Sequence, residues 1–362
     1  MHAPTNDVAA ESMSAARREI VRPKVDNSVP LDQWRGFALV LVLISHGLYF
    51  TGRVHGIGRV GVNLFFFISG VLVFRSLARR SANSGWELAA KFWYRRLKRL
   101  FPALLTYVVA MFPAVFVLQH YFEAPEFGVA AYLKGSPYAV LYAVNYGPHG
   151  IPMSLEHLWS LSCEMQFYLL GPLIFLLGGN RPVRQATIWG GLLALLLISG
   201  LLGAILDRTG AYKYHFEVAV WPMMLGFWCE YRKDLFLRIP AAWFGPIINV
   251  GIVALLTIAV VMPFGLEMKK PVIAIGTLAF LPCFVAYLSG RPVPGFAGRI
   301  LRWLGERTYS IYLWQQPFTI CNYLPTALHP VGAVLATLVG GVWFHFFERP
   351  FLSTGRKRSI PG

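Results

Sequence analysis

The sequence predicts an all-α integral membrane protein with about ten transmembrane helices. Hydrophobic residues make up 56% of the 362 residues, whereas charged residues make up only 14%. Apolar stretches of 17 to 22 residues recur along the chain, and each is long enough to cross the ~30 Å hydrocarbon core of a bilayer as a helix. A membrane β-barrel would instead need strands of about ten residues with alternating polarity, which these continuous runs lack.

The distribution of basic residues predicts the orientation of these helices. The expected spans lie at about 31–51, 61–78, 97–118, 157–178, 186–206, 215–230, 243–263, 271–289, 303–323 and 330–347. With the N-terminus inside, the cytoplasmic segments hold 26 of the 33 Lys and Arg residues, so the positive-inside rule places both termini in the cytoplasm. The net charge of +16 is explained in this way without a nucleic-acid partner.

The spans divide the chain into a membrane domain and two tails. Residues 1–30 are polar and lack the apolar core of a signal peptide, so we expect a disordered cytoplasmic tail there. Residues 31–350 form the ten-helix domain, and 351–362 form a basic cytoplasmic tail. Within the domain, 119–156 is expected to be an outer-side loop with a short or re-entrant helix, because a further span there would invert everything downstream. The four cysteines form no Cys-x-x-Cys pair, so neither a disulfide framework nor a metal site is expected.

The first candidate site is formed by Arg35 and His46 within the first predicted span. Eleven residues at 100° each bring both side chains to one helix face, about 16 Å apart along the axis. Ionisable groups inside a membrane span are costly and mark functional sites. The alternative is that Arg35 only anchors the inner interface and His46 bonds a neighbouring backbone carbonyl.

Glu164 is a second candidate, because a carboxylate inside a predicted span needs a partner. Counting from the helix ends places it at nearly the same depth as His46, which predicts a histidine–carboxylate pair suited to general-base work on a hydroxyl. Ser160, Tyr168 or another helix could satisfy Glu164 instead.

Three further groups of residues are candidates for ligand binding. Arg96 and Arg99 share a helix face near the cytoplasmic start of the third span, where they could bind a polyanion such as a nucleotide diphosphate or merely anchor the helix. Asn63 is polar near the outer end of its span, between Gly61 and Gly70, which permit close helix approach. The span 303–323 contains a run of polar side chains that suits a cavity with a polar ligand: Tyr309, Ser310, Tyr312, Gln315 and Gln316.

Together these segments resemble acyltransferase family 3, the integral-membrane O-acyltransferases that include O-antigen, exopolysaccharide and Nod-factor acetylases. The matching motifs are Leu31-Asp-x-x-Arg-Gly with His46, Gly61-Val-x-Leu-Phe-Phe-x-x-Ser-Gly70, Arg95-Arg-x-x-Arg99 with Pro102, His157-Leu-Trp-Ser-Leu-Ser-x-Glu164-x-x-Phe-Tyr168, Tyr309-Ser-x-Tyr-Leu-Trp314 and Glu348-Arg-Pro350. Three positions depart from the family pattern: Asn63 stands where Asp is frequent, Met165 replaces a second Glu, and Gln315 replaces a His.

The resemblance implies ten transmembrane helices, a cytoplasmic acyl-CoA donor, and acyl transfer to a sugar hydroxyl on the outer side. It also implies that Arg35, His46, Arg96 and Arg99 are essential. Some larger members carry an extra SGNH domain; this chain stops fifteen residues after its last predicted span, so we expect the membrane domain to complete the transfer.

From these expectations we predict a bacterial inner-membrane O-acyltransferase whose acceptor side is periplasmic. Acyl-CoA, with acetyl-CoA favoured, is a substrate, and no tightly bound cofactor is expected. The acid–base pair would be His46, as general base or transient acyl carrier, and Glu164, which would orient it. The donor would bind near Arg35, Arg96 and Arg99, and the predicted substrate-binding residues are Asn63, Trp159, Tyr309, Tyr312 and Gln315, with Tyr146 as a further stacking group.

The acceptor stays open between surface polysaccharide, peptidoglycan, a lipid-linked glycan and a secreted small molecule. A transporter or flippase for a glycan or lipid-linked sugar is the alternative function. The two halves of the sequence show no repeat symmetry of the kind that transporters often have. Consumption of a thioester would distinguish the two functions, because only an acyltransferase breaks that bond.

Overall fold

The computed structural model describes residues 28–48, 55–80, 85–122, 128–148, 150–179, 181–206, 214–236, 238, 250–251, 292–319 and 329–352. All regular elements in these ranges are helical, which confirms the predicted class. Five helical segments of the described chain are long and apolar enough to cross a membrane: Ile57–Ala78, Gly85–Tyr121, Met153–Gly178, Pro182–Gly203 and Pro330–Leu352. The number ten and the orientation of the termini stay predictions. The predicted span 271–289, most of 243–263 and nearly all of both tails lie outside the described residues.

Four helices occupy positions close to their predicted spans: α2 (Ser28–Gly47), α3 (His55–Ala78), α7 (Trp159–Gly178) and α8 (Pro182–Leu206). Helix α4 (Gly85–Phe122), which corresponds to the third predicted span, is 38 residues long and begins well before the predicted start at 97. Hydropathy misses this extension because it is rich in Lys and Arg, which form helices readily but do not cross lipid.

The predicted outer-side loop 119–156 contains three helical elements in addition to the end of α4. These are α5 (Val129–Val140), the 3₁₀ turn η3 (Val144–Tyr146) and the short α6 (Met153–Glu156). The buried hydroxyl of Tyr132 on α5 donates to the carbonyl of Val108 on α4 at 2.7 Å. This bond ties α5 to the transmembrane helix α4.

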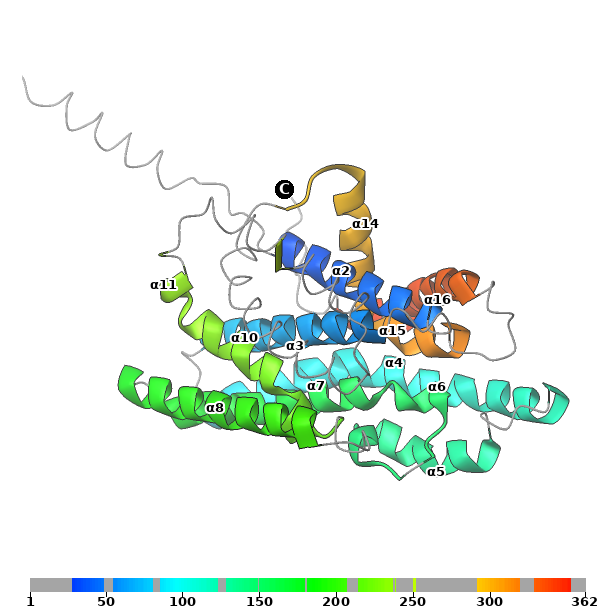
Figure 1. The fold of residues 1–362 in the computed structure, drawn as a ribbon, viewed down its shortest axis with the longest axis horizontal. Coiled ribbons are helices and arrows are strands. Elements are labelled where there is room, and N and C mark those ends of the chain that lie inside the picture. The colour runs from blue at the N-terminus through cyan, green and yellow to red at the C-terminus, as the bar shows by residue number, and fades with distance from the viewer. Residues whose placement is uncertain are drawn as a thin grey trace, which may run out of the picture.

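The predicted span 303–323 is wrong, because two helices replace it. α14 (Gly295–Glu306) ends and α15 (Thr308–Thr319) begins at Arg307, whose guanidinium lies over the rings of Trp303 and Phe344. Figure 1 shows α14 rising steeply away from the bundle while α15 runs within it. The break contains no Pro or Gly, so nothing local in the sequence marks it.

Two other predicted spans are divided in the structure. The segment 215–230 comprises α9 (Phe216–Ala219) and α10 (Trp221–Tyr231), with Pro222 in the first turn of α10, where its missing N–H costs nothing. A four-residue helix, α11 (Lys233–Phe236), follows. The last span comprises α16 (His329–Trp343), the π-helical turn η5 (Phe344–Glu348) and α17 (Arg349–Leu352).

Glycines bring the backbones of α3 and α10 into direct contact. A Cβ atom at Gly70 would overlap the carbonyl of Met223, and one at Gly226 would overlap the carbonyl of Phe67. A Cβ at Gly61 would likewise lie 2.7 Å from the carbonyl of Ala38 on α2. These contacts support the packing role predicted for Gly61 and Gly70, since small residues let membrane helices approach closely.

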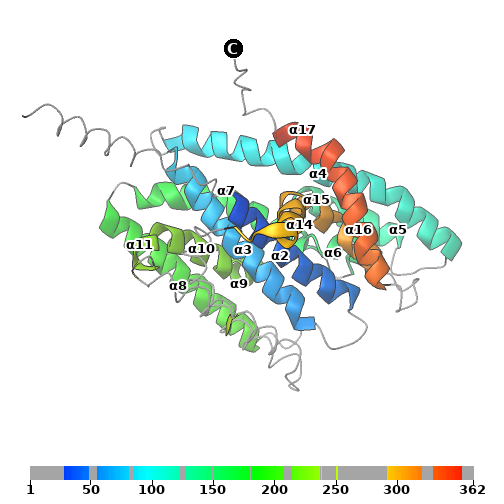
Figure 2. The same cartoon turned by 90° about the horizontal axis from the view of Figure 1, so that it is seen from above.

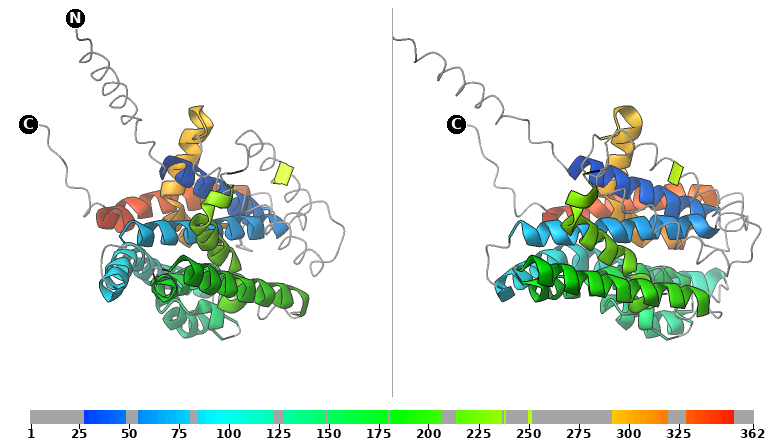
Figure 3. Two further views of the ribbon diagram at one scale, coloured as in Figure 1. Left: turned by 90° about the vertical axis from the view of Figure 1, so that its left-hand side faces the viewer. Right: turned by 60° about the vertical axis from the view of Figure 1, so that its left-hand side comes forward.

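The helices form layers around α3 and α7. In Figures 1 and 3, α2 and α14 lie on one side of α3, whereas α7 and α8 lie on the other. Seen from above in Figure 2, α4 follows one edge of the molecule and α8 the opposite edge. This arrangement encloses α7, and it places α2, α3, α4 and α15 around one interior space.

Candidate active site

A cavity lies between α2, α3, α4, α7 and α15, with about 660 Å³ of space free of protein atoms, part of it open to solvent. The polar side chains that line it are Arg35, Ser69, Arg96, Arg99, Ser160, Glu164, Tyr168, Thr308, Tyr309 and Tyr312. Six of the ten predicted site residues therefore meet in one place, although they come from four helices that are far apart in the sequence.

The three arginines of the cavity have different partners. Arg35 lies 3.8 Å from Asp32, one turn earlier on α2. Arg99 is held by Glu348, as described below. Arg96 lies over the ring of Tyr168, with 4.6 Å from its guanidinium carbon to the ring centroid, and no carboxylate of the described chain is within ion-pair distance of it. Its N–H donors are therefore available to an anionic ligand.

Glu348 orients Arg99 from the far end of the chain. The Nε and Nη2 atoms of Arg99 lie 3.1 and 2.9 Å from Oε1 of Glu348, and Ser310 donates to Oε2 at 2.8 Å. The carboxylate is fully buried at the end of the π-turn η5. The sequence identifies Glu348 only as part of the Glu348-Arg-Pro350 motif and does not predict this role. The available signal was a carboxylate at the end of an apolar span, which requires a partner.

Glu164 has partners other than the predicted one. Its Oε1 accepts hydrogen bonds from Ser69 on α3 and from Tyr168, one turn later on α7, the latter at 2.5 Å. The predicted contact with His46 is not observed in the described chain, and two of the alternatives are: Tyr168 and a neighbouring helix, α3. Depth counting failed because it assumes that each helix crosses the bilayer along its normal, whereas membrane helices tilt.

His46 instead bonds to Gln315 on α15. The imidazole Nδ1 faces Oε1 of Gln315, whose side chain is fully buried. An amide oxygen only accepts hydrogen bonds, so this contact fits the imidazole tautomer with its proton on Nδ1 and a lone pair on Nε2. A second buried histidine, His157, lies near enough for electrostatic interaction with His46, and its Nε2 pairs with the carbonyl of Leu313 at 3.0 Å.

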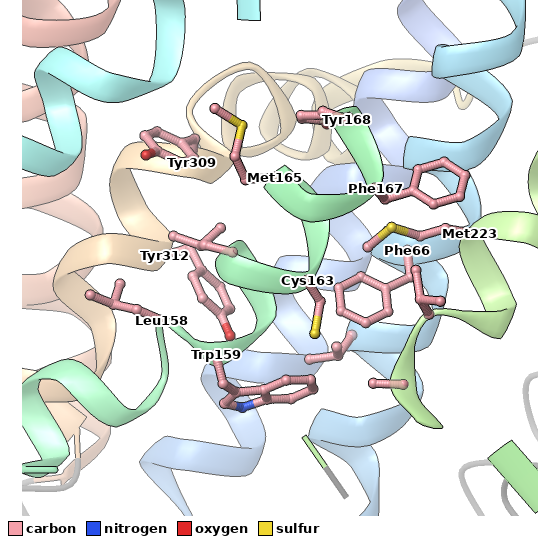
Figure 4. Close-up of a cluster of buried hydrophobic side chains, with 14 of the residues drawn as sticks. Phe66, Leu158, Trp159, Cys163, Met165, Phe167, Tyr168, Met223, Tyr309 and Tyr312 are labelled. Atoms are coloured by element: carbon pink, nitrogen blue, oxygen red, sulfur yellow. The ribbon is translucent and has the colours of Figure 1, made fainter. Parts of the chain in front are cut away.

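Tyr312 lies between the arginine cavity and the partner of His46. It lines the cavity and precedes Gln315 by three residues on α15, so both project from the same helix face. Its hydroxyl pairs with Ser160 at 2.7 Å, while the hydroxyl of Tyr309 donates to the carbonyl of Leu100 at 2.9 Å. In Figure 4 the ring of Tyr312 extends toward Trp159 at the start of α7. Tyr312 therefore stands at the cavity wall one helical turn from Gln315, the partner of His46.

Three predicted substrate residues lie outside the cavity lining: Gln315, which bonds to His46, and Asn63 and Trp159. Asn63 is 5% exposed within α3. Trp159 is 8% exposed, with Tyr214 stacked on its ring at 4.4 Å and the guanidinium of Arg59 5.6 Å from the ring centroid. Trp159 is thus not an exposed stacking platform. Arg59, counted among outer-loop residues in the predicted topology, lies inside α3.

Tyr146 is the most exposed of the predicted stacking groups. Its hydroxyl donates to Oε2 of Glu217 at 2.6 Å, and its ring lies 4.8 Å from that of His215. Burial and the bond to Glu217 raise the pKa of Tyr146, which keeps the hydroxyl protonated and donating. The side chain of Tyr146 is 48% exposed, so one part of the ring is open to a ligand.

Comparison with known families decides the class of the protein. The family model of the acyltransferase domain matches residues 30–347. The chain belongs to acyltransferase family 3. The matched part of this acyltransferase runs from α2 into η5, and it includes every predicted site residue. Glu348 follows directly after its last matched residue.

The curated relatives of this acyltransferase are bacterial O-acetyltransferases. It is 27% identical to O-acetyltransferase OatA of Staphylococcus aureus, over 90% of this chain and 57% of the relative. It is 26% identical to the putative peptidoglycan O-acetyltransferase YrhL of Bacillus subtilis and to the peptidoglycan O-acetyltransferase OatA of Listeria monocytogenes, over 90% of this chain in each case. The alignments cover 55% and 56% of those two proteins, so the acyltransferase spans little more than half the length of these relatives.

Proposed function

We propose that this acyltransferase transfers an acyl group, with acetyl favoured, from cytoplasmic acyl-CoA to a hydroxyl of a cell-envelope glycan. The observation that carries the proposal is a cavity lined by three arginines whose wall residue Tyr312 stands one helical turn from Gln315, the partner of His46. Acyl-CoA suits this arrangement, because a long arm joins its polyanionic nucleotide to its reactive thioester.

On the donor side, Arg96 and Arg35 would bind the phosphates of CoA, and Arg99 would be held in place by Glu348. Guanidinium groups bind phosphate oxygens through paired N–H donors, which makes arginine well suited to this task. The arm would then extend along Tyr309 and Tyr312 toward His46. The distance between Arg35 and His46, about 16 Å along α2, is comparable to the length of the pantetheine arm.

At the reacting end, Nε2 of His46 would take the proton of the acceptor hydroxyl while the hydroxyl oxygen attacks the thioester carbonyl carbon. The new C–O bond replaces the C–S bond, and the CoA sulfur leaves with the proton returned from the imidazole. An ester and free CoA are the products. His46 could instead accept the acyl group first and pass it to the hydroxyl. Both routes require His46.

For the acceptor, we propose peptidoglycan as the first glycan to test, because two of the relatives carry that substrate in their names. The acyltransferase would lie in the bacterial plasma membrane with both termini in the cytoplasm. The acceptor would then approach from the outer side, where Tyr146 and Glu217 offer an exposed ring and a carboxylate to a sugar.

The test uses the purified full chain in liposomes with radiolabelled acetyl-CoA and soluble peptidoglycan fragments. We expect acceptor-dependent release of CoA and labelled ester on the glycan. His46→Ala should lower the rate at least about 100-fold, the loss expected on removal of a general base. His120→Ala is the matched control, because this histidine is exposed near the end of α4 and should leave the rate unchanged.

Two results would overturn the proposal. Transfer at the wild-type rate by a folded His46→Ala protein would remove His46 from the mechanism. Passage of a labelled glycan across the liposome membrane without release of CoA would instead assign the chain to the transporters.

A further inference from the structure

Gln315 stands where a reactive histidine usually has a charged partner. In the described chain, His46 bonds to this neutral amide and to no carboxylate. The side chain of Gln315 is fully buried in α15, a helix that is far from α2 in the sequence. An amide at this place holds the ring of His46 without placing a second charge inside the membrane domain.

The two ends of the Gln315 amide are used unequally. Its Oε1 bonds to His46, whereas its buried Nε2 has no hydrogen-bond partner in the described part of the chain. An unpaired buried donor destabilises a fold. A glutamine retained only for packing or stability would be expected to pair both ends, so the position of Gln315 is better explained by what it does to His46.

We propose that Gln315 is a positioning residue that fixes His46 in the tautomer with its proton on Nδ1. This inference rests on the proposed function, in which Nε2 of His46 receives the proton of the acceptor hydroxyl. The Nδ1 proton stays in the bond to Gln315 throughout, and the mobile proton passes from hydroxyl to Nε2 and then to the CoA sulfur. With the opposite tautomer, Nε2 would carry a hydrogen and could not accept that proton.

The kinetic test compares two substitutions of Gln315 in the full-length protein in liposomes. Gln315→Leu keeps the shape but removes the acceptor, and we expect kcat to fall about 10- to 100-fold, as when a histidine loses its orienting partner in a metal site. The KM for acetyl-CoA should change less than about twofold, because only a transition-state interaction is lost. Gln315→Glu restores an acceptor and should recover most of kcat.

Gln316→Leu provides the matched control. Gln316 is the next residue on α15, is also buried at 7% exposure, and has no bond to His46. Its replacement should leave kcat close to wild type. Equal losses in Gln315→Leu and Gln316→Leu would overturn the inference while leaving the proposed function intact, whereas an active His46→Ala protein would overturn both.

A direct measurement reports the tautomer in the wild-type protein itself. Two-bond ¹H–¹⁵N correlation of ¹⁵N-histidine-labelled wild-type protein in detergent micelles reports which ring nitrogen carries the proton, and the His46 signals are assigned by their loss in His46→Ala. We expect a protonated Nδ1 and an unprotonated Nε2. The reverse pattern in the wild type would overturn the inference.

Discussion

Arg99 and Glu348 are 249 positions apart in the sequence and form an ion pair whose carboxylate is fully buried. One oxygen of Glu348 accepts two N–H groups of Arg99, and the other accepts the hydroxyl of Ser310. The pair joins α4, η5 and α15 at one wall of the cavity, so the orientation of a proposed donor-binding arginine depends on the π-turn η5 near the other end of the chain.

Replacement of Glu348 should therefore destabilise the protein. Glu348→Ala leaves the guanidinium of Arg99 without its partner, and we expect the free energy of unfolding to fall by about 3 kcal/mol, as when one member of a buried pair is removed. Glu306→Ala breaks the exposed pair with Arg302 and should cost no more than about 1 kcal/mol. Denaturant unfolding in detergent measures both, and similar losses would contradict the importance assigned to the buried pair.

Arg96 and Arg95 allow a matched test of donor binding. Arg96→Ala removes the cavity guanidinium that lacks a carboxylate partner, and we expect the Kd for CoA to rise about 10- to 100-fold, because hydrogen bonds to charged groups contribute about 1.5–3 kcal/mol. Arg95 is exposed on the same helix and does not line the cavity. Arg95→Ala should leave the Kd nearly unchanged by isothermal titration. If both variants weaken CoA equally, the cluster acts only through its net charge.

Glu164 should be coupled energetically to the cavity and not to the histidine pair. Its hydrogen bond from Tyr168 and its proximity to Arg96 predict that Glu164→Gln and Arg96→Ala have non-additive effects on the Kd for CoA, by about 0.5–3 kcal/mol. Glu164→Gln and Gln315→Leu have no shared partner and should be additive within about 0.5 kcal/mol. A double-mutant cycle for each pair measures the coupling. Strong coupling of Glu164 to Gln315 alone would restore the originally predicted His46–Glu164 relationship.

The contact between α3 and α10 predicts that Gly70 does not tolerate a side chain. Gly70→Ala would drive a methyl group into the carbonyl of Met223, and we expect a loss of at least about 1–3 kcal/mol. Gly191 on α8 has open space at its Cβ position, so Gly191→Ala should instead stabilise the helix by about 0.5–1 kcal/mol. Thermal unfolding in detergent compares the two, and equal shifts would show that α3 and α10 can move apart.

The periodicity of apolar residues was sufficient to predict the helical membrane class and the positions of α2, α3, α7 and α8. It could not predict the division at Arg307, because a hydropathy window merges the end of amphipathic α14 with α15. The change of direction there depends on how Gly305 packs against the backbone of Asp32 on α2. Such a contact depends on the tertiary structure and has no local signature.

The same distinction applies to the candidate site. The sequence by itself determined which residue types stand at which helix positions: Arg35 and His46 on one face of α2, Arg96 and Arg99 on one face of α4, and a polar run on α15. Only the tertiary structure decided that His46 meets Gln315, 269 positions away, and that Glu164 joins the arginine cavity. The physical reason is that 3.6-residue periodicity fixes the face of a single helix, whereas partners across helices depend on tilt and relative depth, which are set by packing of the whole bundle.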